Sequence, residues 1–152
     1  MRVLFVCLGN ICRSPAAEAI FTKKIEDLGK SHVFSCESAG IIGAHSGEFC
    51  DPRMKQALNQ RGYDSTTRSR KVQKTDFETF DFILGMDNSN IDELKALKPH
   101  TSRASIHAMC EFAIDRHEYE VPDPYYGGAE GFDTVIDILD DTIRGFIQKV
   151  HA

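Results

Sequence analysis

The stretch that most constrains this chain is residues 3–14, Val-Leu-Phe-Val-Cys-Leu-Gly-Asn-Ile-Cys-Arg-Ser, followed by Pro15. Residues 3–6 are a short apolar run with β-branched and aromatic residues, which predicts a buried strand. Ser14 and Pro15 are typical of a helix start, as the N-cap and the first helical residue. A strand, a tight loop and a helix start in succession favour an anion-binding site, because the free N–H groups and the dipole of the helix meet there.

Short apolar runs and amphipathic segments continue to alternate along the chain. Further strands are expected at residues 33–36, 80–86 and 104–109, and loops at residues 41–50 and 115–131. Helices are expected after residue 14, after an Asp51-Pro52 cap, after Asn88 or Ser89, and over residues 132–150, with Gly29, Gly62 and Pro99 ending the first three. Strands that alternate with helices predict an α/β fold, with a parallel sheet covered by helices on both faces. Ligands of such sheets bind at the carboxyl ends of the strands.

Composition indicates a soluble globular protein that forms a single domain over residues 1–152. Apolar residues make up 41% and charged residues 27% of the 152, and the net charge of −5 argues against a nucleic-acid partner. The basic run at residues 68–71 either faces an acidic partner or is a solvated loop. No apolar stretch approaches the ~20 residues of a membrane span, so no membrane partner is expected. Five cysteines without a secretory segment favour free thiols and a cytoplasmic location.

Cys7 and Arg13 are the candidate catalytic pair of the first loop. Gly9 and Asn10 are residue types that readily take left-handed backbone angles, which lets successive N–H groups turn inward around an anion. Arg13 adds a planar fork of donors that suits two oxygens of a tetrahedral oxyanion. A thiolate held under these groups is a nucleophile for phosphoryl transfer. The alternative is a buried cysteine in a βα turn, with Arg13 as a surface charge.

The remaining cysteines do not suggest a metal site. Paired CxxC spacing, which is typical of zinc ligands, does not occur among the five cysteines. Cys12 lies on the same loop as Cys7, and two interpretations stay open for it. It is either an inert small residue of the turn or a thiol that forms a disulfide with oxidised Cys7. We expect no cofactor.

The motif VCLGNICRSP followed by Ala-Glu, together with Asp123-Pro124-Tyr125-Tyr126, resembles the low-molecular-weight protein tyrosine phosphatases. The likeness covers nearly the whole chain in length and in motif order. It implies a four-stranded sheet in the order 2-1-3-4, and a phosphotyrosine hydrolase that works through a phosphocysteine intermediate. It also implies a phosphate-binding loop made of Leu8, Gly9, Asn10, Ile11, Cys12 and Ser14 around the catalytic Cys7 and Arg13.

The resemblance assigns roles to further residues. Asp123 matches the general acid that protonates the leaving phenolate, whereas the bare sequence favours a surface turn at Pro-Asp-Pro. Ser14 would hydrogen-bond the Cys7 thiolate. Asn10 would hold the loop by bonding toward Ser38.

A narrow aromatic cleft is expected beside the loop. Tyr125 and Tyr126 would wall it, so that a phosphate at the end of a phenyl ring reaches the thiolate. The family commonly carries a large aromatic residue on the opposite lip, where this chain has Ala44 followed by His45. His45 is either a contact of the cleft or a solvated loop histidine.

Phosphotyrosine proteins or peptides are therefore the expected partners, with phosphate and vanadate as competing oxyanions. We expect a monomer and leave a weak dimer open. An arsenate reductase on this fold would need further cysteines at residues 85–90, which contain none. Protein arginine phosphatases resemble this chain but carry Thr where Ile11 stands. A non-enzymatic phosphate-binding or phosphocarrier module would have no use for Asp123, because it has no leaving phenol to protonate.

Overall fold

The computed structural model, which describes residues 1–125 and 127–151, contains a four-stranded parallel sheet in the order β2-β1-β3-β4. The strands are β1 (Arg2–Cys7), β2 (Ser35–Gly40), β3 (Phe82–Gly85) and β4 (Ser105–Ala108). The α/β class, the parallel pairing and the implied strand order are confirmed.

β2 lies further along the chain than the predicted strand at residues 33–36. Ser38 pairs with Phe5, and Gly40 pairs with Cys7 at the last position of the strand. A Cβ atom at Gly40 would lie 3.0 Å from the Gly9 carbonyl carbon and 3.0 Å from Leu8 O. Residues 38–40 therefore belong to the strand that was predicted to end before them, and Gly40 is needed there because only glycine lets the strand approach the first loop so closely.

The other two predicted strands, at residues 80–86 and 104–109, are too long. Phe80 is the C-cap of a short helix, α3 (Asp76–Thr79), and Met109 begins a 3₁₀ helix, η1 (Met109–Phe112). The sequence predicted neither element. Both are only four residues long, too short for an apolar period to appear in the sequence.

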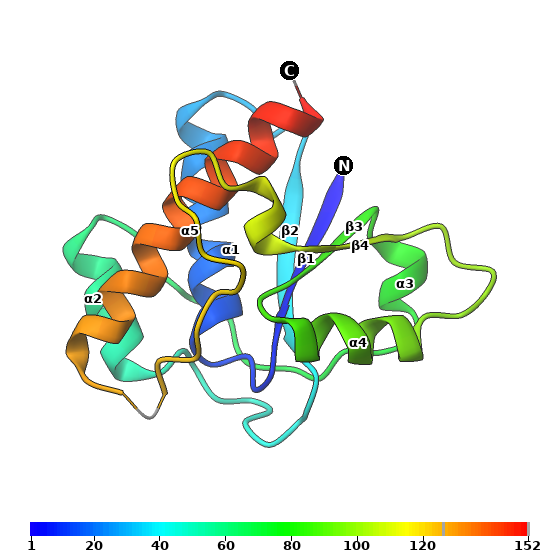
Figure 1. Ribbon diagram of the computed structural model, residues 1–152, viewed down its shortest axis with the longest axis horizontal. Helices are drawn as coiled ribbons and strands as arrows, with labels where there is room; N and C mark the ends of the chain where they lie inside the picture. Colours follow the sequence, from blue (N-terminus) through cyan, green and yellow to red (C-terminus); the bar gives the residue numbers. More distant parts are fainter. Residues whose placement is uncertain (126, 152) are drawn as a thin grey trace.

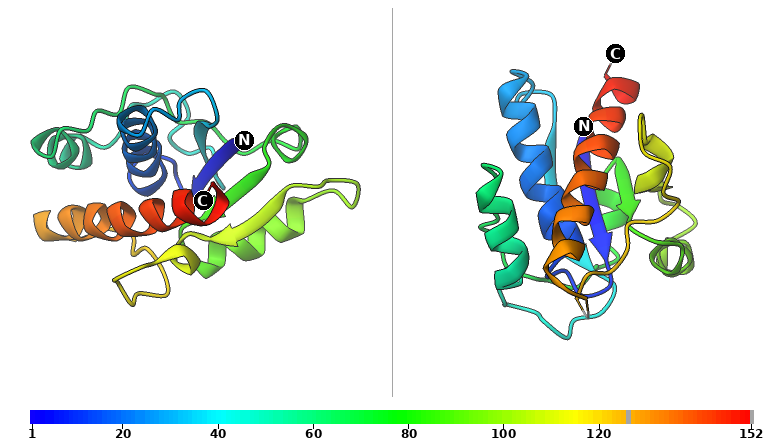
Figure 2. Two further views of the ribbon diagram at one scale, coloured as in Figure 1. Left: turned by 90° about the horizontal axis from the view of Figure 1, so that it is seen from above. Right: turned by 60° about the vertical axis from the view of Figure 1, so that its left-hand side comes forward.

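Helices cover both faces of the sheet, as predicted. On one face lie α1 (Arg13–Asp27), α2 (Pro52–Gln60) and α5 (Ala129–Val150), and on the other lie α3 and α4 (Asn88–Leu97) (Figures 1 and 2). The alternation along β1 supplies both cores. Val3 and Phe5 pack with α1 and α5, while Leu4 and Val6 pack with α3 and α4.

Local signals set most helix ends. Asp51 caps α2 and accepts from Arg53 N at 2.8 Å, as predicted. Gly29 and Gly62, which follow α1 and α2, take φ values of +69° and +84°. The predicted cap of α4 at Asn88 or Ser89 is wrong by one or two positions. Asp87 caps that helix in a capping box with Asn90.

The edge of the sheet at which a ligand site was expected brings together segments that are far apart in the sequence. Figure 1 shows the loop after β1, the segment that follows β2 and the segment that precedes α5 at the bottom of the view, beyond the carboxyl ends of the strands. The predicted loop at residues 41–50 forms turns there. The basic run lies alongside this loop through an antiparallel bridge from Arg68 to Phe49, and Arg70 pairs with Asp76 at 2.9 Å. Within the described ranges, no helix is both long and apolar enough to cross a bilayer.

Candidate active site

The loop between β1 and α1 curls around a small cavity. Asn10 takes the left-handed conformation, with φ of +56°, whereas Gly9 does not. Gly9 is required for a different reason. A Cβ atom at Gly9 would lie 3.1 Å from Cδ2 of His45, so the bare backbone leaves room for that ring. The prediction of left-handed angles is confirmed for Asn10 and wrong for Gly9.

Buried hydrogen bonds of Asn10 hold the loop in shape. Asn10 Nδ2 donates to Ser14 Oγ at 2.7 Å, and Asn10 Oδ1 accepts from Arg70 N at 3.0 Å. Ser69 Oγ donates to the Asn10 carbonyl. The predicted bond toward Ser38 is wrong, because Ser38 Oγ donates instead to Glu18 Oε1 at 2.5 Å. Asn10 therefore ties the loop to the basic segment rather than to Ser38.

Cys7 ends β1 with its sulfur buried under the loop. Cys7 Sγ lies 3.0 Å from Ser14 Oγ and accepts from Asn10 N at 3.3 Å. The contact that the resemblance implied between Ser14 and Cys7 is present. Ser14 is not the N-cap of α1, because the helix begins at Arg13 with Cys12 in the cap position. Its hydroxyl faces the thiol instead of the helix end.

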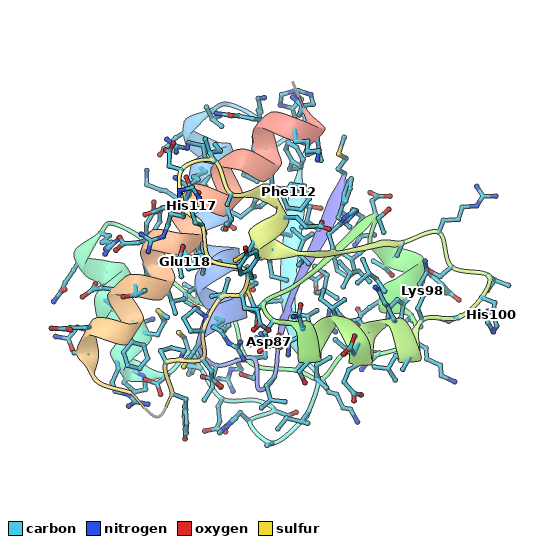
Figure 3. All side chains as sticks on the ribbon, viewed as in Figure 1. Asp87, Lys98, His100, Phe112, His117 and Glu118 are labelled. Carbon is cyan, nitrogen blue, oxygen red and sulfur yellow. The ribbon has the colours of Figure 1, made fainter. Side chains whose placement is uncertain are left out.

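Arg13 lies buried beside the thiol. Nη1 donates to Asp87 Oδ2 at 2.7 Å and to the Val121 carbonyl at 3.0 Å, and Nη2 lies 3.6 Å from Asp123 Oδ2. Burial alone would lower the pKa of Arg13, but the neighbouring Cys7 and Asp87 raise it above its usual value. The guanidinium therefore keeps its charge in a dry setting. Figure 3 labels Asp87 at the start of α4.

Asp123 lies in the segment that leads from Val121 to α5. Its Oδ1 accepts from Tyr125 N at 3.0 Å, and its side chain is 39% exposed. Val121 is fixed to the sheet edge by a bond from its N–H to Met86 O at 2.8 Å. Asp123 is therefore held over the loop from a rigid base and remains accessible to a ligand.

These groups share one pocket of about 120 Å³. The loop from Cys7 to Arg13 forms its floor, and the side walls come from Ile42, His45, Asp123 and Tyr125. The structure thus brings together Cys7, Arg13 and Asp123, the predicted catalytic residues. A larger cavity of about 630 Å³, between the carboxyl ends of α1 and α5, contains none of these three groups.

The lip of the pocket differs from the prediction at Ala44. Ala44 is exposed and does not line the pocket. His45 does line it: Nδ1 lies 2.8 Å from Glu48 Oε2, and the ring centroid lies 6.1 Å from that of Tyr125. His45 thus lies at the pocket wall, where the cleft interpretation places it, and its contact with a substrate stays a prediction. Ile42 was missed, and Tyr126 lies outside the described residues.

The thiols other than Cys7 are buried or half-buried. Burial, reinforced by Asp51, raises the pKa of Cys12 far above its usual value. Burial also raises the pKa of Cys50 to about 12. Cys12 lines the same pocket as Cys7. Across residues 1–125 and 127–151, no group of three or more His, Cys, Asp or Glu residues is placed to hold a metal ion.

Comparison with known proteins agrees with this geometry. A family model described as low molecular weight phosphotyrosine protein phosphatase matches residues 2–152. A protein of that name from Schizosaccharomyces pombe is 39% identical, covering 99% of this chain and 97% of its own. A crystal structure of a protein tyrosine phosphatase from Entamoeba histolytica, with Hepes in the active site, is 45% identical with a TM-score of 0.96. The match covers 99% of this chain and 96% of that one. The structure of a Drosophila arginine phosphatase is 32% identical with a TM-score of 0.93, and the match covers 100% of this chain and 99% of that one.

Proposed function

The chain belongs to the low molecular weight phosphotyrosine protein phosphatase family, and on that premise we propose that it hydrolyses phosphotyrosine esters in two steps through a phosphocysteine intermediate. The observation that carries the proposal is the shared pocket of Cys7, Arg13 and Asp123, in which a thiol, a guanidinium and a carboxyl group line one space of about 120 Å³. The Hepes bound in the active site of the Entamoeba structure carries a sulfonate, another tetrahedral anion.

In the first step the Cys7 thiolate attacks phosphorus, and the bond to the phenol oxygen breaks. Arg13 and the loop N–H groups hold the equatorial oxygens, and this preorganised stabilisation is the largest contribution to catalysis. Ser14, 3.0 Å from the sulfur, supports the thiolate by donating its hydroxyl proton. Asp123 gives a proton to the leaving oxygen, an effect typically of about 10²- to 10⁴-fold.

In the second step water attacks the phosphocysteine. Asp123, now ionised, accepts a proton from that water, phosphate is released and Cys7 returns as the thiolate. The countercharge for phosphate comes from Arg13 and the loop. We therefore expect EDTA to have no effect, and inorganic phosphate and orthovanadate to compete with substrate.

The walls of the pocket favour a flat aromatic ester. Tyr125 and His45 both line the pocket, with ring centroids 6.1 Å apart, and we expect the phosphate of a phosphotyrosine to reach Cys7 past these rings while the shorter phosphoserine stops above it. Protein arginine phosphatase is the second candidate, since the Drosophila arginine phosphatase shares this fold. Ile11 lies in the pocket lining, where its bulk favours a phenyl ring over a guanidinium.

Turnover of phosphotyrosine, phosphoserine and phosphoarginine peptides, with wild type and Cys7→Ser, tests the proposal. We expect phosphotyrosine to be hydrolysed fastest and Cys7→Ser to be inactive. Cys110→Ser is the matched control, because Cys110 is half-buried and lies outside the pocket lining. Normal turnover by Cys7→Ser would reject the nucleophile, and a preference for phosphoarginine would select the second candidate.

The role of Asp123 needs its own measurement. For Asp123→Asn, kcat/KM should fall most for esters with poor leaving groups, because those depend most on protonation. An equal loss across all leaving groups would reject Asp123 as the acid.

A further inference from the structure

The guanidinium of Arg53 joins the start of α2 to the segment that carries Asp123. Its Nε donates to Asp51 Oδ1 at 3.1 Å, and Nη2 donates to Asp51 Oδ2 at 3.0 Å, which is a two-point contact. The same Nη2 donates to the Tyr125 carbonyl at 3.0 Å. One side chain therefore bonds two segments that are far apart in the sequence.

Aromatic rings fix the plane of this guanidinium. Cζ of Arg53 lies 5.4 Å from the ring centroid of Tyr125 and 4.8 Å from that of Phe132 at the start of α5. Such contacts contribute about 0.5–1 kcal/mol each at exposed sites. A planar group that is both stacked and bonded in a fork has little freedom to turn.

Hydrogen bonds continue from Arg53 toward the reacting groups in both directions. Asp51 N donates to Ile11 O in the phosphate-binding loop at 2.7 Å. Tyr125 N donates to Asp123 Oδ1 at 3.0 Å. Hydrogen bonds thus connect the loop that holds phosphate, through Asp51, Arg53 and Tyr125, to the carboxylate of Asp123.

The other end of the acid segment is fixed separately. Arg13 Nη1 and Met86 O bond the backbone of Val121. Asp123 therefore lies between two fixed points, Val121 at the sheet edge and Tyr125 at Arg53. Loss of either point should let the carboxyl group move relative to the phosphate.

We propose that Arg53 is a positioning residue that sets the distance and direction of Asp123 toward the leaving oxygen of the ester. This inference rests on the proposed phosphatase reaction and adds a residue outside the pocket lining to it. Arg53 acts through Tyr125 and does not itself touch the reacting atoms. A general acid contributes fully only when it is within hydrogen-bond reach of the oxygen that it protonates, so a small displacement reduces its effect.

The test compares kcat/KM of Arg53→Ala for aryl phosphates with good and poor leaving groups, p-nitrophenyl phosphate and phenyl phosphate. We expect about a tenfold loss for phenyl phosphate and less than about a twofold loss for p-nitrophenyl phosphate. Arg53→Lys should fall between wild type and Arg53→Ala, because an ammonium group cannot bond Asp51 in a fork and Tyr125 at the same time.

Two controls separate positioning from general destabilisation. Arg61→Ala removes another arginine next to the same helix, one that pairs with Asp137 at 2.6 Å, and should leave the leaving-group dependence unchanged. In an Asp123→Asn background, Arg53→Ala should cause no further loss of kcat/KM, because Arg53 acts only through Asp123.

The outcomes are distinguishable. If Asp123→Asn shows the leaving-group dependence and Arg53→Ala does not, the positioning role is rejected and the proposed reaction stands. If Asp123→Asn shows none, the proposed reaction fails at its acid. A loss confined to KM for acidic peptides would show that Arg53 binds substrate directly, and would also overturn the proposal.

Discussion

The buried Arg13 and the half-buried Asp87 form an ion pair across the site, with Nη1 of the arginine 2.7 Å from Oδ2 of the aspartate. The second oxygen of Asp87 accepts from Asn90 N at 2.9 Å and caps α4. One carboxylate therefore starts a helix on one face of the sheet and orients the arginine of the phosphate-binding loop. Folding of α4 and the geometry of the phosphate site depend on the same residue.

Asp87→Asn should separate these two roles. Asparagine is as good an N-cap as aspartate, so we expect Asp87→Asn to lower the free energy of unfolding only through the charge that Arg13 loses, and not through the cap. The buried Arg13 loses the anion that its Nη1 bonds, and we expect kcat/KM to fall by about 10- to 100-fold through misalignment. Activity assays and urea unfolding of the same samples check both parts.

Asp87→Ala is the matched comparison, since it removes cap and charge together. It should show the same loss of activity and, in addition, cost about 1 kcal/mol of stability. Wild-type activity in Asp87→Asn would mean that Arg13 is oriented without this charge.

Residues close in sequence were predicted best. Cys7 and Arg13 share one loop, and the Asp51-Pro52 cap is a local signal, so both could be predicted from the chain itself. Asp87 lies 74 positions from Arg13, and nothing in the local sequence distinguishes a cap that also binds an arginine from one that does not. Asp123 was proposed as the acid only because the chain resembles a family, since its own sequence favours a turn.

The steric room around a residue was harder to predict from the sequence than its local backbone conformation. Glycine at positions 9 and 40 suggests a turn, but the structure requires glycine there for another reason. Other atoms lie within about 3 Å of the place that a Cβ atom would occupy. For Gly9 that neighbour is the ring of His45, which comes from another loop. Such requirements follow from tertiary packing, which no periodicity in the sequence reports.

Cys12 should protect oxidised Cys7 more effectively as pH rises. After a pulse of hydrogen peroxide, which converts the Cys7 thiolate to a sulfenic acid, attack by Cys12 sulfur forms the disulfide and releases water. Burial keeps the pKa of Cys12 above the working range, so its thiolate fraction, and the rate of disulfide formation, should rise about tenfold per pH unit. Mass spectrometry of samples quenched with catalase at pH 6.5, 7.5 and 8.5 measures this rate.

Cys12→Ser should lose the disulfide and accumulate the irreversible sulfinic acid at Cys7. Cys50→Ser is the control, because Cys50 is also buried with a raised pKa, of about 12. A disulfide between Cys7 and Cys50, or a rate of disulfide formation that does not depend on pH, would contradict the protective role of Cys12.

Glu18 should make folding stability fall as pH rises. It lies on α1 and accepts from Ser38 at 2.5 Å and from Thr67 at 3.1 Å. Burial raises its pKa in the folded state, so the folded chain holds this proton more tightly than the unfolded chain does. The stabilisation that results is fully present below about pH 4.3, the pKa of a glutamate in the unfolded chain. It is lost as pH rises through the higher pKa that Glu18 has in the folded chain.

Glu18→Gln removes this dependence and keeps the acceptor oxygen. The unfolding free energy of Glu18→Gln relative to wild type should therefore increase between pH 4 and pH 7, as measured by urea denaturation. Glu26→Gln, at an exposed position of the same helix, is the matched control. A relative stability that decreases over this range would contradict the sign.

Replacing Gly145, in the C-terminal half of α5, should lower the stability of the fold. Alanine is favoured over glycine in a helix by about 1 kcal/mol, so the sequence alone predicts that Gly145→Ala stabilises. A Cβ at this position would lie 1.8 Å from Phe112 O and 3.0 Å from the carbonyl carbon of Phe112. Figure 3 labels Phe112 at η1, beside α5.

Because the obstructing atoms are backbone, the 3₁₀ helix must move away from α5 to make room. We expect Gly145→Ala to cost about 2–4 kcal/mol, which for a chain of this size lowers Tm by about 5–15 °C in a thermal scan. Gly131→Ala in the same helix is the control: its Cβ would meet Pro124 Cβ at an ordinary 3.5 Å, so its Tm should stay level or rise. Equal Tm values for the two variants would show that η1 yields to α5 at little cost, and that helix propensity decides both positions.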